Sequence, residues 1–165
     1  PDFIALLNYK IPRPQQPSNF AMLLRKYLRG KKINNMWQHG FDRVVVVEFD
    51  DYYIIAELLP RGNIFFVGKS DMRLWSAMIK SNLRFRDLRI HKQYSFPAQP
   101  LNPISVSFED LKKVLKEEKD KVVAVLAHKF SLSGVYAEEI CMKAKVNKTK
   151  IANKLKEEEL SLIHI

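Results

Sequence analysis

Residues 44–57 read VVVVEFDDYYIIAE, and this stretch decides the fold class of the chain. The four valines at 44–47 and the run at 52–55 are β-branched or aromatic residues, which favour strands. Asp50 and Asp51 stand between the two runs and predict a tight turn. The stretch therefore predicts two neighbouring antiparallel strands. The unbroken valine run further suggests that the first strand is covered on both faces.

The sequence on either side extends this hairpin into an antiparallel meander. The predicted strands cover 33–38, 41–49, 52–59, 64–67 and 72–80. A later segment, 84–92, alternates cationic with apolar residues, which predicts a further strand with arginines on both of its faces.

Helices are predicted before and after the sheet. Before it, Ser18 or Asn19 caps a helix that starts at Phe20 and ends at Gly30. Beyond the sheet, Ser107 and Asp120 are the expected caps of the first two of four short helices. These helices are predicted at 107–116, 121–130, 135–145 and 149–159.

Three prolines within 97–103 mark a boundary between the two regions. We expect an α+β chain with a β-rich domain over 1–100 and a helical module over 104–159. Residues 160–165 read LSLIHI and look like a translated sequencing-adapter end, so a non-native tail is predicted there. Because the chain also lacks an initiator Met, we expect it to be a fragment.

Positive charge is concentrated in the first domain. Residues 1–100 carry 16 Lys and Arg against 8 Asp and Glu, whereas residues 101–165 carry 12 against 10. All nine arginines precede residue 90. Because the guanidinium group matches phosphate geometry, this distribution indicates an anionic partner, and nucleic acid is favoured over a membrane surface.

Two basic segments are the candidate binding surfaces: the first helix with the residues just after it, and the segment 84–92. The candidate residues are Arg25, Lys26, Arg29, Lys31, Lys32, Arg84 and Arg86. Each segment also has a purely structural interpretation. The helix could be a solvated face whose cations favour its C-terminal dipole, and the strand could be an edge protected by charge.

Several chemistries are not favoured. Cys141 is the single cysteine, which excludes a disulfide framework and a cysteine zinc site. The five glycines show no phosphate-loop spacing, and the four histidines form no metal-binding motif. No apolar stretch approaches the ~18 residues of a membrane span. We therefore expect no metal, no cofactor and no membrane partner, and a cytoplasmic location.

Four segments carry a resemblance to a known family. They are 17–30 (PSNFAMLLRKYLRG), 38–45 (QHGFDRVV), 57–64 (ELLPRGNI) and 136–141 (YAEEIC). In these segments the chain resembles the NFACT family of ribosome-associated quality control factors, which includes the RqcH and NEMF proteins and was formerly called fibronectin-binding A-like. It is most similar to archaeal members.

The resemblance implies a fold and a function. The fold would be a domain like the N-terminal domain of formamidopyrimidine-DNA glycosylase, followed by a helix-hairpin-helix-like module. Family members bind the large ribosomal subunit with its peptidyl-tRNA and recruit tRNA for template-free C-terminal tailing of the stalled chain. The family's signature pair for handling tRNA falls on Asp42 and Arg43.

We expect the chain to position RNA and not to act as an enzyme, because the ribosome would form the peptide bond. The alternatives are a DNA-processing protein of the glycosylase type and, from the older family name, a surface adhesin. One departure from the family is Lys145, which stands where relatives often have a glycine suited to a left-handed helix cap.

Overall fold

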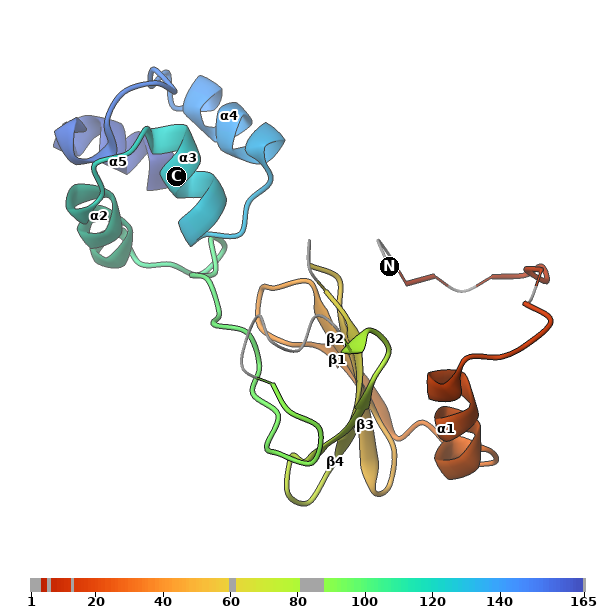
Figure 1. Cartoon of the computed structure of the whole chain (residues 1–165). Coiled ribbons are helices and arrows are strands. Elements are labelled where there is room, and N and C mark those ends of the chain that lie inside the picture. Colours follow the sequence, from red (N-terminus) through yellow and green to blue (C-terminus); the bar gives the residue numbers. More distant parts are fainter. Residues whose placement is uncertain (1–3, 6, 13, 60–61, 81–87, 165) are drawn as a thin grey trace. The chain divides into compact units, whose positions relative to one another are not determined.

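The computed structural model describes the whole chain except residues 1–3, 6, 13, 60–61, 81–87 and 165. The chain divides into two compact units (Figure 1). The first unit comprises residues 1–39 and 43–97, and the second comprises 40–42 and 98–165.

The first unit is built on a five-stranded antiparallel sheet whose strand order follows the sequence. The strands are β1 (Asn35–Gln38), β2 (Val44–Glu48), β3 (Tyr52–Glu57), β4 (Ile64–Gly68) and β5 (Leu74–Ala77). This arrangement confirms the predicted meander and the α+β class. All the strands except β4 are shorter than the predicted runs. Strand β2 begins only at Val44, so residues 40–43 form a turn and bend before it.

The sheet buries one face against the segment that follows β5. This core includes Val44, Val46, Ile55, Phe65, Val67, Leu74, Ala77, Leu88 and Tyr94. Along β2 burial alternates, because Val45 and Val47 are only half-buried. The prediction that this strand is covered on both faces therefore holds only in part, because the second face is only partly buried. Its valine run reflects the β-propensity of valine more than complete burial.

Helix α1 (Asn19–Leu28) lies beside the sheet (Figure 1). Ser18 caps it by accepting a hydrogen bond from the backbone N–H of Ala21 at 3.2 Å. The helix contacts the sheet through Tyr27. The Tyr27 ring centroid lies 5.5 to 5.6 Å from those of Tyr52, Phe66 and Trp75. No residue of α1 is fully buried.

The predicted strand at 84–92 falls partly outside the described residues. The part that is described, 88–92, is a loop and turn, so the prediction of a strand is wrong there. His91 adopts a positive φ of 69°, and its backbone N–H donates to the carbonyl of Leu74. Leu88 and Tyr94 on either side of this turn point into the core, which overrides the alternation of residue types.

The second unit is helical. Its elements are α2 (Phe108–Glu117), α3 (Val122–Lys129), α4 (Gly134–Lys143), the 3₁₀ turn η2 (Ala152–Lys154) and α5 (Glu157–His164). Ser107 caps α2 as predicted, by accepting from the N–H of Asp110. Lys121, not Asp120, occupies the cap position of α3.

The predicted fourth helix at 149–159 is wrong. An isolated β-bridge pairs Ile151 with Lys121, and the N–H of Val122 donates to the carbonyl of Lys150 at 2.8 Å. In place of one helix, the segment holds this bridge, the η2 turn and the start of α5. Helix α5 begins later and places Leu160 and Ile163 in the core of the unit. The origin of residues 160–165 and the exact domain limits stay predictions.

Candidate nucleic-acid interface

Helix α1 presents a cationic face. Arg25, Lys26 and Arg29 are exposed, and the helix contains no acidic residue. The Arg25 guanidinium lies 3.8 Å from the sulfur of Met22, and the Lys26 ammonium lies 5.4 Å from the centroid of the Tyr27 ring. Within the described parts of the chain, none of the three cations forms an ion pair. Their charges are therefore available to an anionic ligand.

The two lysines that follow α1 differ from each other. The Lys31 ammonium lies 3.6 Å from a carboxylate oxygen of Asp50 and 3.9 Å from one of Asp51, in the turn between β2 and β3. Lys32 is exposed, and no described carboxylate pairs with it. Sequence alone does not distinguish them, because the acidic turn is about 20 residues away along the chain. Of the two, Lys32 is the better candidate for contact with phosphate.

The acidic turn is itself organised by Asn34. Its side-chain amide donates to Asp50 at 2.8 Å. This hydrogen bond, followed by the charge of Lys31, lowers the pKa of Asp50 below its ordinary value. The turn thus holds a carboxylate within ion-pair distance of Lys31.

Arg84 and Arg86 lie outside the described residues. Their proposed place beside the other cations is therefore untested. The cationic surface that the structure does describe consists of the α1 face and Lys32.

Asp42 and Arg43 lie in the bend that leads into β2, and they have opposite environments. Asp42 is 6% exposed, whereas Arg43 is exposed to solvent. The turn starts at Gly40, which has a φ of +61°, a conformation that glycine adopts without strain. The predicted strand over 41–49 is wrong at these two positions, because β2 begins only at Val44.

Two buried side chains that the sequence did not single out lie at the end of β3 opposite the start of β2, and in the segment after β5. Glu57 is 4% exposed and Tyr94 is 3% exposed, and the tyrosine hydroxyl donates to Oε1 of Glu57 at 2.6 Å. Glu57 is the partner of Val44 across the sheet, and the N–H of Leu58 donates to the carbonyl of Arg43 at 2.7 Å. A signal was present in the sequence: Glu57 is an acidic residue that continues an apolar strand.

The loop after Glu57 is held by Asn63. This side chain is 1% exposed, donates to the carbonyl of Ile79 at 2.7 Å and accepts from the N–H of the same residue at 2.9 Å. Gly62 packs against the Glu57 carbonyl and against Leu59, which leaves no space for a β-carbon. The segment 57–64 therefore contributes structure at its described positions.

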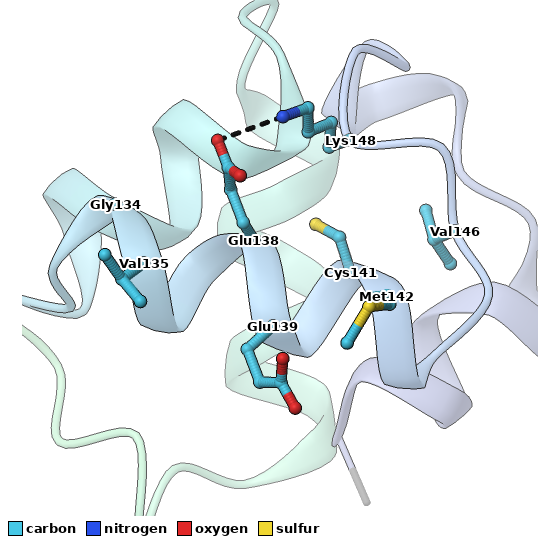
Figure 2. A pocket seen from close by; sticks show the side chains of 8 residues that line it. All are labelled: Gly134, Val135, Glu138, Glu139, Cys141, Met142, Val146 and Lys148. Atoms are coloured by element: carbon cyan, nitrogen blue, oxygen red, sulfur yellow. Dashed lines mark ion pairs between the residues drawn. The ribbon is translucent and has the colours of Figure 1, made fainter.

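In the helical unit, a hollow runs along α4 (Figure 2). Val135 and Met142 are exposed at its rim, and Glu138 forms an ion pair with Lys148 at 3.0 Å. Cys141 is buried, as expected, and desolvation raises the pKa of its thiol. Because both Glu138 and Glu139 are paired with lysines, this hollow offers little net charge to RNA.

The described residues contain no cluster of His, Cys, Asp or Glu that could hold a metal ion. Among the same residues, no helix has the length and apolarity that are needed to cross a membrane.

Comparison with known proteins gives a consistent result. Residues 3–164 match the family described as NFACT N-terminal and middle domains. The archaeal Rqc2 homolog aRqcH of Methanocaldococcus jannaschii is 36% identical over 168 residues, which is 96% of this chain and 25% of that protein. Human ribosome quality control complex subunit NEMF is 34% identical over 82 residues, or 47% of this chain and 7% of that protein.

Solved structures give the same fold. The N-terminal domain of the fibronectin-binding protein PavA from Streptococcus pneumoniae has a TM-score of 0.64 at 27% identity, covering 82% of this chain and 56% of that one. A Lactococcus lactis Fpg protein in complex with DNA containing an abasic site has a TM-score of 0.56 at 17% identity, over 87% of this chain and 60% of that one. The Fpg likeness shows the fold alone.

The chain spans a quarter of the length of the archaeal relative. Its family match covers nearly all of its residues, and its sequence relatives carry the names of ribosome quality control proteins. This chain therefore belongs to the NFACT family of ribosome quality control factors.

Proposed function

We propose that this chain is an RNA-binding part of a cytoplasmic ribosome quality control factor. It would bind the large ribosomal subunit that still holds peptidyl-tRNA, and recruit tRNA for template-free C-terminal tailing of the stalled chain. The named relatives support the quality control role, and the observation that carries the RNA contact is the cationic face of α1.

The α1 face fits a phosphate backbone for two reasons. Arg25, Lys26 and Arg29 are exposed, and no described carboxylate competes for them. Arginine can also bind a phosphate through two parallel hydrogen bonds, which fixes orientation as well as charge. RNA binding here requires neither acid–base chemistry nor a metal, so the chain would act by positioning its ligand.

The first experiment measures the binding of bulk tRNA to the 165-residue chain over a series of salt concentrations. The logarithm of the affinity falls linearly with the logarithm of the salt concentration, and each phosphate contact adds about 0.7 to 0.9 to the magnitude of this slope. Alanine at Arg25, Lys26 and Arg29 together should reduce the magnitude of the slope by about 2 to 3. The matched control replaces Lys113, Lys119 and Lys154, three exposed lysines of the second unit, and should leave more of the slope intact. An equal reduction of the slope in both variants would show that tRNA binding depends on net charge alone and not on the α1 face.

The second experiment tests the ribosomal partner. The chain is co-sedimented with large subunits that carry peptidyl-tRNA, and the retained tRNA is compared among wild type, Asp42→Ala and Arg43→Ala. Loss of tRNA in the variants supports the proposal. Retention at the wild-type level in both variants would remove this pair from the site.

The alternative function, DNA processing of the glycosylase type, is tested by incubating the chain with an abasic duplex and borohydride. A covalent adduct would overturn the proposal in favour of an enzyme. The likeness to Fpg is the reason for this control.

A further inference from the structure

We infer that the buried Glu57–Tyr94 pair positions Arg43 for contact with RNA. This inference rests on the proposed function, and it assigns a positioning role to two residues that do not themselves reach the ligand. The starting observation is the hydrogen bond from the Tyr94 hydroxyl to Glu57, between two almost fully buried side chains.

The pair is linked to Arg43 through the backbone of the sheet. Glu57 ends β3 and faces Val44, the first residue of β2. The next residue, Leu58, donates its N–H to the carbonyl of Arg43. The backbone after Glu57 is therefore joined to the carbonyl group of Arg43 by a hydrogen bond of 2.7 Å, and a shift of Glu57 would act on Arg43 through it.

Tyr94 is also linked to the other end of the same turn. The Tyr94 ring contacts Phe96 at a centroid distance of 5.2 Å, and Phe96 stacks on His39 at 3.7 Å. The backbone N–H of His39 donates to the carbonyl of Val44 at 2.8 Å. The two ends of the 40–43 turn, His39 and Arg43, are thus tied to one tyrosine.

Tyr94 is held firmly enough to act as this anchor. Its backbone N–H donates to the carbonyl of Met72 at 2.6 Å, and its ring packs against Phe65 at 5.2 Å. A buried carboxylate is a poor choice for stability alone, because well-packed apolar residues often do as well or better. A carboxylate that accepts a hydrogen bond from a fixed hydroxyl, however, is held in a single orientation, which fixes the end of β3.

The experiment uses the salt dependence of tRNA binding, because a merely structural defect leaves the slope unchanged. A partly unfolded population lowers the apparent affinity by the same factor at every salt concentration. The loss of one phosphate contact instead lowers the magnitude of the slope, by about 0.7 to 0.9. The variants are Arg43→Ala, Tyr94→Phe and the two combined. Tyr53→Phe is the control, since this tyrosine packs against the same core and its hydroxyl makes no hydrogen bond to the described residues.

We expect Tyr94→Phe and Arg43→Ala to lower the magnitude of the slope by similar amounts. The double variant should lower it no further, because the effects of coupled residues do not add. Tyr53→Phe should match the wild type. If Arg43→Ala lowers the slope and Tyr94→Phe does not, the positioning role is wrong while the proposed function stands. If Arg43→Ala itself leaves the slope unchanged, the proposed contact at Arg43 fails.

A second variant keeps the test decisive if Tyr94→Phe does not fold. Glu57→Gln replaces a charge-assisted hydrogen bond by a weaker neutral one. Its slope should lie between those of the wild type and Arg43→Ala. A wild-type slope in a folded Glu57→Gln variant would overturn the positioning role.

Discussion

Tyr94 donates a hydrogen bond to Glu57 across 37 residues of sequence, and this bond joins the segment after β5 to the end of β3. In Tyr94→Phe the carboxylate would stay buried and lose this donor. We expect the free energy of unfolding to fall by about 1 to 3 kcal/mol. Tryptophan fluorescence in a urea titration measures this change, because Trp37 and Trp75 both belong to the first unit. Tyr53→Phe serves as the control, and an equal loss there would contradict the explanation.

Gly62→Ala should also destabilise the first unit. A β-carbon at this position would overlap the Glu57 carbonyl and lie 2.8 Å from the backbone N of Leu59, so the loop would have to move. Overpacking of this kind costs about 1 to 3 kcal/mol. Gly134→Ala is the matched control, since nothing lies within 4 Å of its β-carbon position. A stability of Gly62→Ala equal to wild type would mean that the loop adapts freely.

The acidic turn makes a prediction about pH. Asn34→Ala removes the hydrogen bond that lowers the pKa of Asp50, so this pKa should rise toward its ordinary value. A lowered carboxyl pKa stabilises the folded chain above the ordinary pKa, and this contribution is lost as the pH falls through the lowered one. NMR titration of the Asp50 carboxyl group measures the shift. Lys31→Ala should raise the pKa less, and Lys32→Ala should leave it unchanged.

Lys145→Gly should stabilise the second unit. Lys145 has a φ of +54°, and the N–H of Val146 donates to the carbonyl of Cys141 at 2.9 Å, as in a left-handed helix cap. A residue with a side chain loses about 1 kcal/mol of stability in this conformation, and glycine removes that cost. Part of the gain is offset, because glycine also gives the unfolded chain more conformational freedom. The expected gain is therefore below about 1 kcal/mol. It can be followed by the helical circular dichroism signal, and Lys145→Ala should show no gain.

The sheet could be predicted from sequence because its signals are local. The alternation of strand and turn residues around Asp50 and Asp51 determines which segments pair, and each strand pairs with the next. The helix at 19–28 was equally accessible, since its cap and its apolar spacing lie within one short segment. The end of the helical unit was not, because the bridge between Lys121 and Ile151 is a contact between distant residues.

The candidate site shows the same division. The exposed cations of α1 follow from helical spacing, but the ion pairs of Lys31 depend on a turn that only the fold brings near. Glu57 continues an apolar strand, which was a signal for its burial, yet its tyrosine partner could not be read from the sequence. Non-local hydrogen bonds and ion pairs were thus the features that required the structure.

The strand order of the sheet has a consequence for how the chain acquires its structure. Because each strand pairs with its successor, a growing polypeptide needs no later segment to complete an earlier hairpin. Pairing between close neighbours in sequence lowers the entropy lost on loop closure and favours rapid folding. We expect the hairpins to form one after another as synthesis proceeds. Force-arrest measurements on nascent chains of increasing length would show this as successive steps, and a single late step would contradict it.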